Sequence, residues 1–103
     1  MESHMVMVIL EANVGKEDEL KQALEKVAEL SRGEDSCMQY RLYQDKKNPT
    51  LFGLYEIWKS EQLHQEQFGK PYILEFIKLS ADLLAKPFVG IAAPETEFME
   101  SEV

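Results

Sequence analysis

Two stretches of this 103-residue chain are apolar on both of their alternating faces. Residues 5–10 read MVMVIL and residues 50–58 read TLFGLYEIW. Side chains of a strand point alternately to the two sides of a sheet. A strand with one solvent-exposed face therefore alternates between apolar and polar residues, and both stretches lack this alternation. In the second stretch, one face carries Leu51, Tyr55 and Ile57, and the other carries Phe52, Leu54 and Trp58. The pattern predicts two strands of a sheet that is covered on both sides.

The segments between and beside these stretches predict a helix and a hairpin. Residues 16–31 repeat apolar residues at helical spacing, with acidic residues in the first turn and Gly33 as a stop signal. Residues 37–45 form another aromatic-rich stretch, which a turn at Asn48-Pro49 joins to residues 50–58. We therefore expect strand, helix, strand and strand in that order.

The second half of the chain predicts a broken helix and one more strand. Ser60 can cap a helix, and Gly-Lys-Pro at residues 69–71 interrupts it. Helical spacing then resumes with Ile73, Phe76, Ile77, Ser80 and Leu84. Pro87 ends the helix, and residues 88–93 read as a short strand. The order β-α-β-β-α-β is that of the ferredoxin-like α+β fold, an antiparallel sheet with both helices on one face.

The second face of such a sheet needs a cover that one chain does not supply. Two helices, each about 10 Å across, cover one face of a four-stranded sheet about 19 Å wide and no more. The other face would expose a far larger apolar patch than monomers tolerate. We therefore expect a homodimer formed through the sheets.

Length and composition limit the remaining possibilities. The chain is expected to be a single domain over residues 1–103, with a core at about 5–93 and an acidic tail at 94–103. Its net charge of −8 argues against nucleic acid and anionic membrane as partners. Cys37 is the only cysteine, and no run approaches the roughly 20 apolar residues of a membrane span. We expect a cytoplasmic protein, and His4, which resembles a cloning remnant in its context, is assigned no role.

Three segments spread over nearly the whole chain carry a family resemblance. They are VGKEDEL, the hairpin region SRGEDSCMQYRLYQDKKNPTLFGLYEIWKS with its Tyr55-Glu56-x-Trp58 motif, and FGKPYI. In them the chain resembles the antibiotic biosynthesis monooxygenase family. The resemblance implies a dimeric α+β barrel, in which two ferredoxin-like subunits pack sheet to sheet. It also implies a range of functions, because the family includes cofactor-free quinol and anthrone oxygenases, haem-degrading enzymes, a sugar-phosphate isomerase and proteins of unknown activity.

One family position differs in this chain. Many members carry a histidine nine residues after the tryptophan, where this chain has Gln67, and His64 lies almost one helical turn earlier. We take His64 as the candidate catalytic base, since its unperturbed pKa of about 6.5 suits proton transfer; a solvated surface histidine is the alternative. The asparagine, tryptophan and histidine of the haem-degrading branch align with Val8, Gln67 and Ile77, so haem is not expected.

The sequence offers no cofactor motif. It has no Gly-rich phosphate loop and too few histidines and cysteines for a transition-metal site, so we expect neither cofactor nor metal. Triplet oxygen reacts slowly with closed-shell molecules, so the substrate itself would have to supply electrons. The leading hypothesis is a cofactor-independent monooxygenase that oxidises a quinol or polyketide-like phenol. The alternatives are an isomerase using the same cavity and a non-catalytic, ligand-binding or stress-related dimer.

Further residues are candidates for contact with a small aromatic substrate. They are Trp58, Phe68, Gln67, Tyr72 and Asn13. Packing is the competing interpretation for the aromatic residues, and a turn at the strand end is the competing one for Asn13. Trp58 and Glu56 share a strand face by period two, and Arg41 is expected opposite Glu56 on the hairpin, where an internal ion pair would be structural.

Overall fold

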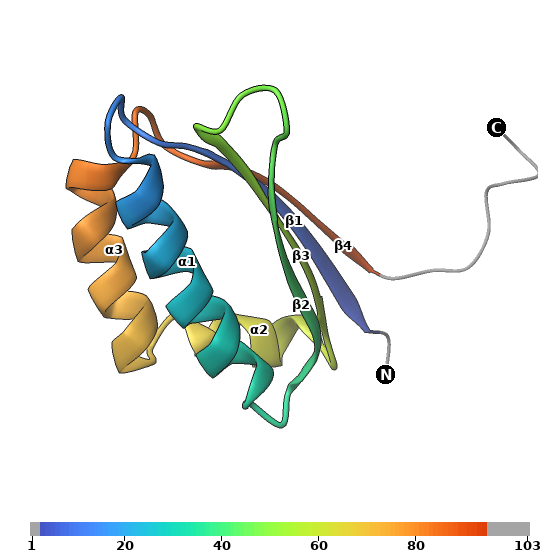
Figure 1. Cartoon of the computed structure of the whole chain (residues 1–103). Helices are drawn as coiled ribbons and strands as arrows, with labels where there is room; N and C mark the ends of the chain where they lie inside the picture. The colour runs from blue at the N-terminus through green and yellow to red at the C-terminus, as the bar shows by residue number, and fades with distance from the viewer. Residues whose placement is uncertain (1–2, 95–103) are drawn as a thin grey trace, which may run out of the picture.

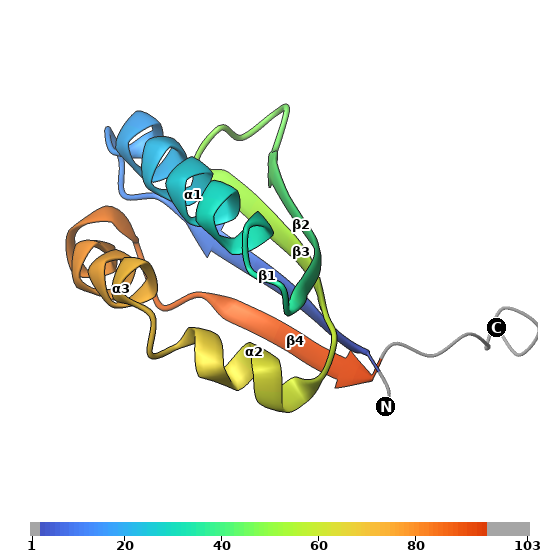
Figure 2. The same ribbon diagram turned by 90° about the horizontal axis from the view of Figure 1, so that it is seen from below.

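The computed structural model describes residues 3–94, and in them helices and strands follow the expected order (Figure 1). In chain order the elements are β1 (His4–Glu11), α1 (Glu17–Arg32), β2 (Cys37–Gln44), β3 (Leu51–Trp58), α2 (Glu61–Gln67), α3 (Pro71–Leu83) and β4 (Val89–Pro94). The helices lie on one side of the sheet, as the view in Figure 2 also shows. This confirms the ferredoxin-like α+β fold. The predicted acidic tail beyond Pro94 lies outside the described residues.

The sheet has the strand order β2-β3-β1-β4, with antiparallel pairing throughout. Its two central strands, β1 and β3, are the two stretches that the sequence marks as apolar on both faces. The predicted pairing of Arg41 with Glu56 is wrong: Tyr40 lies opposite Glu56, and Arg41 lies opposite Tyr55 on the other face. A register irregularity between Cys37 and Gln39 accompanies this pairing, and such an irregularity leaves no clear mark in a sequence.

The broken second helix is confirmed as two helices, α2 and α3. The Ser60 hydroxyl accepts a hydrogen bond from the backbone N–H of Leu63 at 3.2 Å and so caps α2. Pro71 then occupies the first turn of α3, where its missing N–H costs no hydrogen bond. The break lets α3 pack beside α1 while α2 turns across the end of β3 (Figure 1).

The core lies between the sheet and α1. This helix buries Leu20, Leu24, Val27 and Ala28 along one stripe. The sheet contributes Leu10, Phe52 and Trp58, which are at most 2% exposed. Among residues 3–94, no helix has both the length and the apolar character to cross a membrane.

The opposite side of the sheet, which we call the outer face, has no cover from the described part of the chain. Apolar side chains there include Met7, Ile9, Tyr43, Val89 and Ile91, which are 44–65% exposed. These residues belong to the second apolar set of the strands, and most of this set is exposed in the chain, although Ile57 on the same face is 7% exposed.

Candidate functional site

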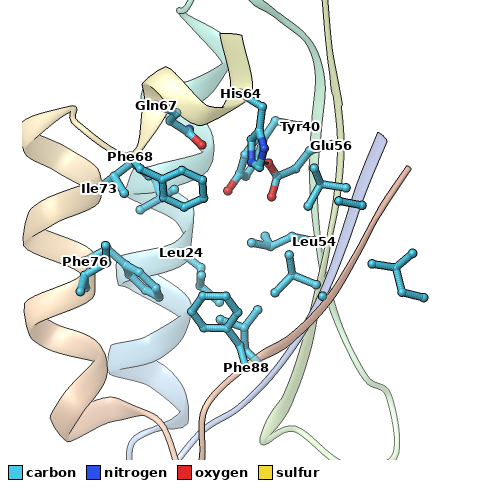
Figure 3. A pocket seen from close by; sticks show the side chains of 18 residues that line it. Leu24, Tyr40, Leu54, Glu56, His64, Gln67, Phe68, Ile73, Phe76 and Phe88 are labelled. Carbon is cyan, nitrogen blue, oxygen red and sulfur yellow. Dashed lines mark ion pairs between the residues drawn. The ribbon is translucent and has the colours of Figure 1, made fainter. Parts of the chain in front are cut away.

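A cavity of about 280 Å³ lies between the inner face of the sheet and helices α2 and α3 (Figure 3). Its volume is close to the lower end of the roughly 300–1,000 Å³ typical of small-molecule sites. Phe68, Phe76 and Phe88 form part of its wall. Gly90 and Ala92 of β4 also line it, and because their side chains are small or absent they leave the space between strand and helices open. The cavity is therefore an apolar site for a compact ligand.

Four polar side chains gather at one end of this cavity: Tyr40, Glu56, His64 and Gln67 (Figure 3). The indole Nε1 of Trp58 donates a hydrogen bond of 2.9 Å to Oε1 of Glu56, and Nε2 of His64 lies 3.8 Å from the same oxygen. The side chains of His64 and Glu56 are only 12% and 5% exposed. The alternative of a solvated surface histidine is therefore wrong, and a carboxyl–imidazole pair faces the cavity.

The Glu56 carboxyl holds its proton far more tightly than an ordinary glutamate. Burial raises its pKa to about 7, against the opposing effect of hydrogen bonds from Trp58 and Tyr40. A buried charge without a counter-ion is costly, and the nearest basic group is the His64 ring. Glu56 therefore changes its charge near neutral pH, which is where a general acid or base works best.

The His64 imidazole is shifted in the opposite direction. Burial lowers its pKa to about 4, and the charge of His4 lowers it further while Glu61 opposes the shift. The ring packs 5.2–5.4 Å, centroid to centroid, from the rings of His4, Trp58 and Phe68. His64 is thus neutral near pH 7, and Glu56 is the stronger proton acceptor of the two. Two groups this close titrate as a pair, and we treat them as one unit.

Gln67 belongs to a second polar network, which ties α2 to α1. Its amide Nε2 donates to the Ser31 hydroxyl at 2.7 Å and contacts the Tyr72 hydroxyl at 3.4 Å. The Tyr72 hydroxyl in turn donates to Glu34 at 2.9 Å, and Lys70 pairs with the same carboxylate at 3.5 Å. The amide N–H groups of Gln67 are therefore used to hold α2 in place above the cavity.

The structure brings only some of the predicted contact residues together. Phe68 and Gln67 line the cavity with His64. Trp58 is fully buried behind Glu56, and Tyr72 lies outside the cavity wall. Asn13 follows the far end of β1, where its carbonyl accepts a hydrogen bond of 2.9 Å from the Lys16 N–H in a turn and its side chain donates to the Asp82 carbonyl of α3 at 2.7 Å.

Sequence reasoning favoured a structural ion pair over a polar site for Glu56 and packing over ligand contact for Tyr40, and it gave no role to His4, whose ring packs against His64. Glu56 and Trp58 share a strand face, and a glutamate on the inward face of a buried strand was the available signal. His4, which had been assigned no role, is 6% exposed and lies in register with Trp58. Tyr40 is 4% exposed, and burial together with the Glu56 charge raises its pKa, so its hydroxyl stays protonated and can donate.

The chemical capacity of the site follows from these groups. Within residues 3–94, no three histidine, cysteine, aspartate or glutamate side chains are placed to hold a metal ion together. The polar end offers a carboxyl, an imidazole and a phenol, which can bind a hydroxyl group and move its proton. The rest of the cavity offers apolar surface, on which a ring system can pack.

Comparison with protein families gives one clear result: the sequence model of the antibiotic biosynthesis monooxygenase family matches residues 3–79. A curated relative, the uncharacterized protein sll1783 of Synechocystis, is 39% identical over 59 residues, which are 57% of this chain. The match spans 40% of that relative's length.

Solved structures share the fold over nearly the whole chain. PA3566 from Pseudomonas aeruginosa is 22% identical and superposes with a TM-score of 0.88, covering 94% of this chain and 97% of its own. A Nitrosomonas europaea protein assigned to the antibiotic biosynthesis monooxygenases is 23% identical, with a TM-score of 0.86 over 91% of this chain and 90% of its own. Rv0793 from Mycobacterium tuberculosis is 24% identical, with a TM-score of 0.84 over 92% of this chain and 97% of its own. At these identities the similarity establishes the fold.

Proposed function

Because the chain belongs to the antibiotic biosynthesis monooxygenase family, we propose that it is a cofactor-independent monooxygenase that oxidises a quinol or polyketide-like phenol with molecular oxygen. The observation that carries the proposal is the Glu56–His64 pair, buried at one end of an otherwise apolar cavity. A phenol becomes a strong electron donor only after it loses its proton. A buried acceptor with a pKa near 7 meets that requirement at physiological pH.

The proposed reaction balances without a further reductant. A phenol with a free para C–H reacts with one O₂ to give a para-quinone and one water. A para-quinol has no free para C–H, and it reacts in the same way at a free ortho C–H to give a hydroxyquinone and one water. The Glu56–His64 pair takes the phenolic proton, and the phenolate then passes one electron to oxygen. Superoxide and the phenoxyl radical combine at the para carbon. The resulting hydroperoxide loses water, whose two hydrogens derive from the phenol O–H and the para C–H, and its remaining oxygen becomes the new carbonyl.

The residues divide this work between them. Trp58 fixes the Glu56 carboxylate through its indole N–H, so the acceptor points in one direction before substrate arrives. His64 is the more exposed member of the pair and can contact the substrate hydroxyl, with Glu56 stabilising the imidazolium or receiving the proton. The phenylalanines position the ring and keep water from the radical pair.

Oxygen uptake with a panel of quinols and fused-ring phenols tests the proposal. We expect quinone formation by the purified protein, and a drop of about 10²- to 10⁴-fold in His64→Ala, the usual size of a general-base contribution. Gln65→Ala, at an exposed position of the same helix, is the matched control. Gln67→Ala tests the family's helix position, and if it lowers turnover more than His64→Ala while melting temperature and ligand affinity stay unchanged, that position governs the site and His64 is not the base. Absence of uptake with every member of the panel would contradict the proposal.

The titration of the pair near neutral pH also favours a second candidate, an isomerase that moves a proton between carbon and oxygen in the same cavity. Exchange of substrate C–H protons in deuterated water, without oxygen uptake, would identify it. Binding with neither exchange nor uptake would leave the non-catalytic ligand-binding protein.

We further propose that the outer face pairs with a second copy of the chain, as in a dimeric α+β barrel. Support comes from the exposure of Met7, Ile9, Tyr43, Val89 and Ile91 on neighbouring strands. An apolar surface of this kind is typical of a subunit interface.

A further inference from the structure

The register of the sheet divides the inner face into a polar row and apolar rows. Tyr40, Glu56, Val6 and Ala92 lie side by side across the four strands. The next inward-facing row, further from α2, consists of Leu42, Leu54, Val8 and Gly90. Beyond it Phe52 lies opposite Leu10 and Gln44, and the exposed Gln44 side chain donates to the Pro49 carbonyl and does not line the cavity. The polar side chains that line the cavity floor are therefore confined to the row beneath α2.

The helices repeat the same division above the cavity. His64 and Gln67 of α2 lie near Tyr40 and Glu56, whereas Phe76 of α3 lies nearer to Leu54 and Phe88 (Figure 3). Phe88 lies at the end away from Glu56 and is 48% exposed. Among the residues that line the cavity, no polar side chain lies at that end.

From this one-sided polarity we infer that the ligand carries its hydroxyl groups along one edge and presents an unsubstituted apolar edge to Phe76 and Phe88. The inference refines the substrate class of the proposed function and rests on it. A hydroxyl at the polar end can donate to the Glu56–His64 pair, whose carboxylate is held in place by hydrogen bonds from Trp58 and Tyr40. A hydroxyl at the apolar end would find no side-chain partner, and it would lose water to the extent that the ligand and the half-exposed Phe88 cover it; an unpaired buried polar group is costly. Fused-ring phenols with clustered hydroxyls fit the cavity, and diols with hydroxyls at opposite ends do not.

Two isomers of one compound test the inference with size and composition held constant. In 1,8-dihydroxynaphthalene both hydroxyls share an edge, and in 1,5-dihydroxynaphthalene they lie on opposite edges. Oxidation at the para carbon converts both into the same quinone, 5-hydroxy-1,4-naphthoquinone. Dissociation constants for the full chain are measured by calorimetry under nitrogen, so that no turnover occurs. We expect the 1,8 isomer to bind at least tenfold more tightly.

A pair of variants at Phe88 tests the cause of the preference. Phe88 is 48% exposed, so the fold should tolerate a change there. Phe88→Gln places a hydrogen-bonding group at the apolar end and should strengthen binding of the 1,5 isomer. The ratio of the dissociation constants of the two isomers should then fall to about three or less. Phe88→Leu is the matched apolar control and should retain the tenfold preference.

The outcomes separate this inference from the proposed function. The inference is overturned if the two isomers bind equally well, even if both are oxidised. It is also overturned if Phe88→Gln and Phe88→Leu reduce the ratio of the two dissociation constants equally. Preferential binding of the 1,8 isomer with no oxygen uptake supports the inference as ligand specificity and contradicts the monooxygenase. Failure of both isomers to bind at millimolar concentration overturns the inference, and oxygen uptake with other phenols then decides the proposed function separately.

Discussion

The two faces of the sheet are built from the same strands and differ in what their side chains meet. On the inner face, Val6, Val8 and Leu10 of β1 are at most 8% exposed beneath the helices. On the outer face, Met7 and Ile9 of the same strand are 44% and 56% exposed. Both the core of a chain and an interface between chains need apolar residues at every second position of a strand. This pattern alone therefore does not tell a core face from an interface face.

Polar residues distinguish the faces more sharply than apolar ones. The inner face buries Glu56 with a hydrogen-bonding indole and a neighbouring imidazole, whereas Arg41, which lies opposite Tyr55 in the outer-facing register, is exposed. Burying a carboxyl is costly, so its presence marks the site on the inner face. Exposed apolar side chains on the outer face in turn support the proposal that a second copy of the chain packs there.

The largest expected effect compares neighbouring residues of β3 that point to opposite faces. Glu56→Gln keeps the hydrogen bond from Trp58 but removes the proton acceptor, and should lower turnover of a phenol substrate by about 10²- to 10⁴-fold. Tyr55→Phe changes the outer face and should leave turnover per site unchanged. Steady-state oxygen uptake measures both. Similar losses in the two variants would mean that the inner face has no special role.

The next effect concerns association. Ile9→Glu puts a charge in the middle of the outer face and should weaken the dimer by about two orders of magnitude or more, because a buried unpaired charge is costly in an interface. Leu74→Glu is a control on the helical side, where Leu74 is similarly exposed at 50%. Sedimentation velocity at micromolar concentration reads out both variants. A wild-type chain that sediments as a stable monomer would rule out the proposed dimer.

The third effect is on stability and follows from the opposed pKa shifts of the pair. The pKa of Glu56 in the folded state is raised to about 7. Its contribution to the free energy of unfolding is therefore fully present below pH 4.5 and is lost as pH rises through 7. The folded pKa of His64 is lowered to about 4, so its contribution is present above pH 6.5 and is lost as pH falls through 4. Between about pH 4.5 and 6.5 the two trends oppose one another, and these groups leave wild-type stability nearly independent of pH.

Glu56→Gln removes one of these trends. The free energy of unfolding of Glu56→Gln minus that of wild type should be larger at pH 8 than at pH 5, by up to about 3 kcal/mol. The reason is that one pKa unit corresponds to about 1.4 kcal/mol. Urea denaturation at the two pH values measures the difference. Glu25→Gln, at an exposed position of α1, is the control. An equal stability difference at both pH values would show that Glu56 does not titrate abnormally.

The smallest effect uses two glycines that lie on opposite faces. Gly90 faces the cavity, and a Cβ there would meet the Met7 carbonyl at 3.4 Å and Val8 Cγ2 at 3.8 Å, so a larger side chain can be accommodated by filling the cavity. Gly90→Leu should weaken binding of 1,8-dihydroxynaphthalene about tenfold. Gly53→Leu adds the same group on the outer face beside Ile9 and should change affinity by no more than about twofold. Equal losses would place the ligand elsewhere.

Much of the fold could be predicted from the sequence, because it depends on local signals. The apolar period of α1, the turn at Asn48-Pro49 and the Gly-Lys-Pro break at residues 69–71 each determine one element or its end. Pairing of β2 with β3 was predicted one residue out of register, because the irregularity near Cys37 depends on packing between distant parts of the chain.

The site was only partly predictable for the same reason. His64 was found as the one interior histidine, but its burial depends on how α2 turns across β3 after the cap at Ser60. The role of Glu56 depends on the indole of Trp58 and on the His64 ring, which come together only in three dimensions. Period two along β3 placed Glu56 on the same face as Trp58, but it gave neither the direction in which that face points nor a shift in the pKa of Glu56.

Oxidation of 1,8-dihydroxynaphthalene under ¹⁸O₂ shows whether the protein transfers an oxygen atom from O₂ to a phenol. The protein is first treated with a chelator, and the uncatalysed oxidation is subtracted with a sample that lacks protein. The account predicts quinone that carries one ¹⁸O atom, formed at a rate that rises with pH through about 7 as Glu56 ionises and that falls at least a hundredfold in Glu56→Gln. A rate no greater than that of the uncatalysed reaction, or quinone without the label, would contradict it.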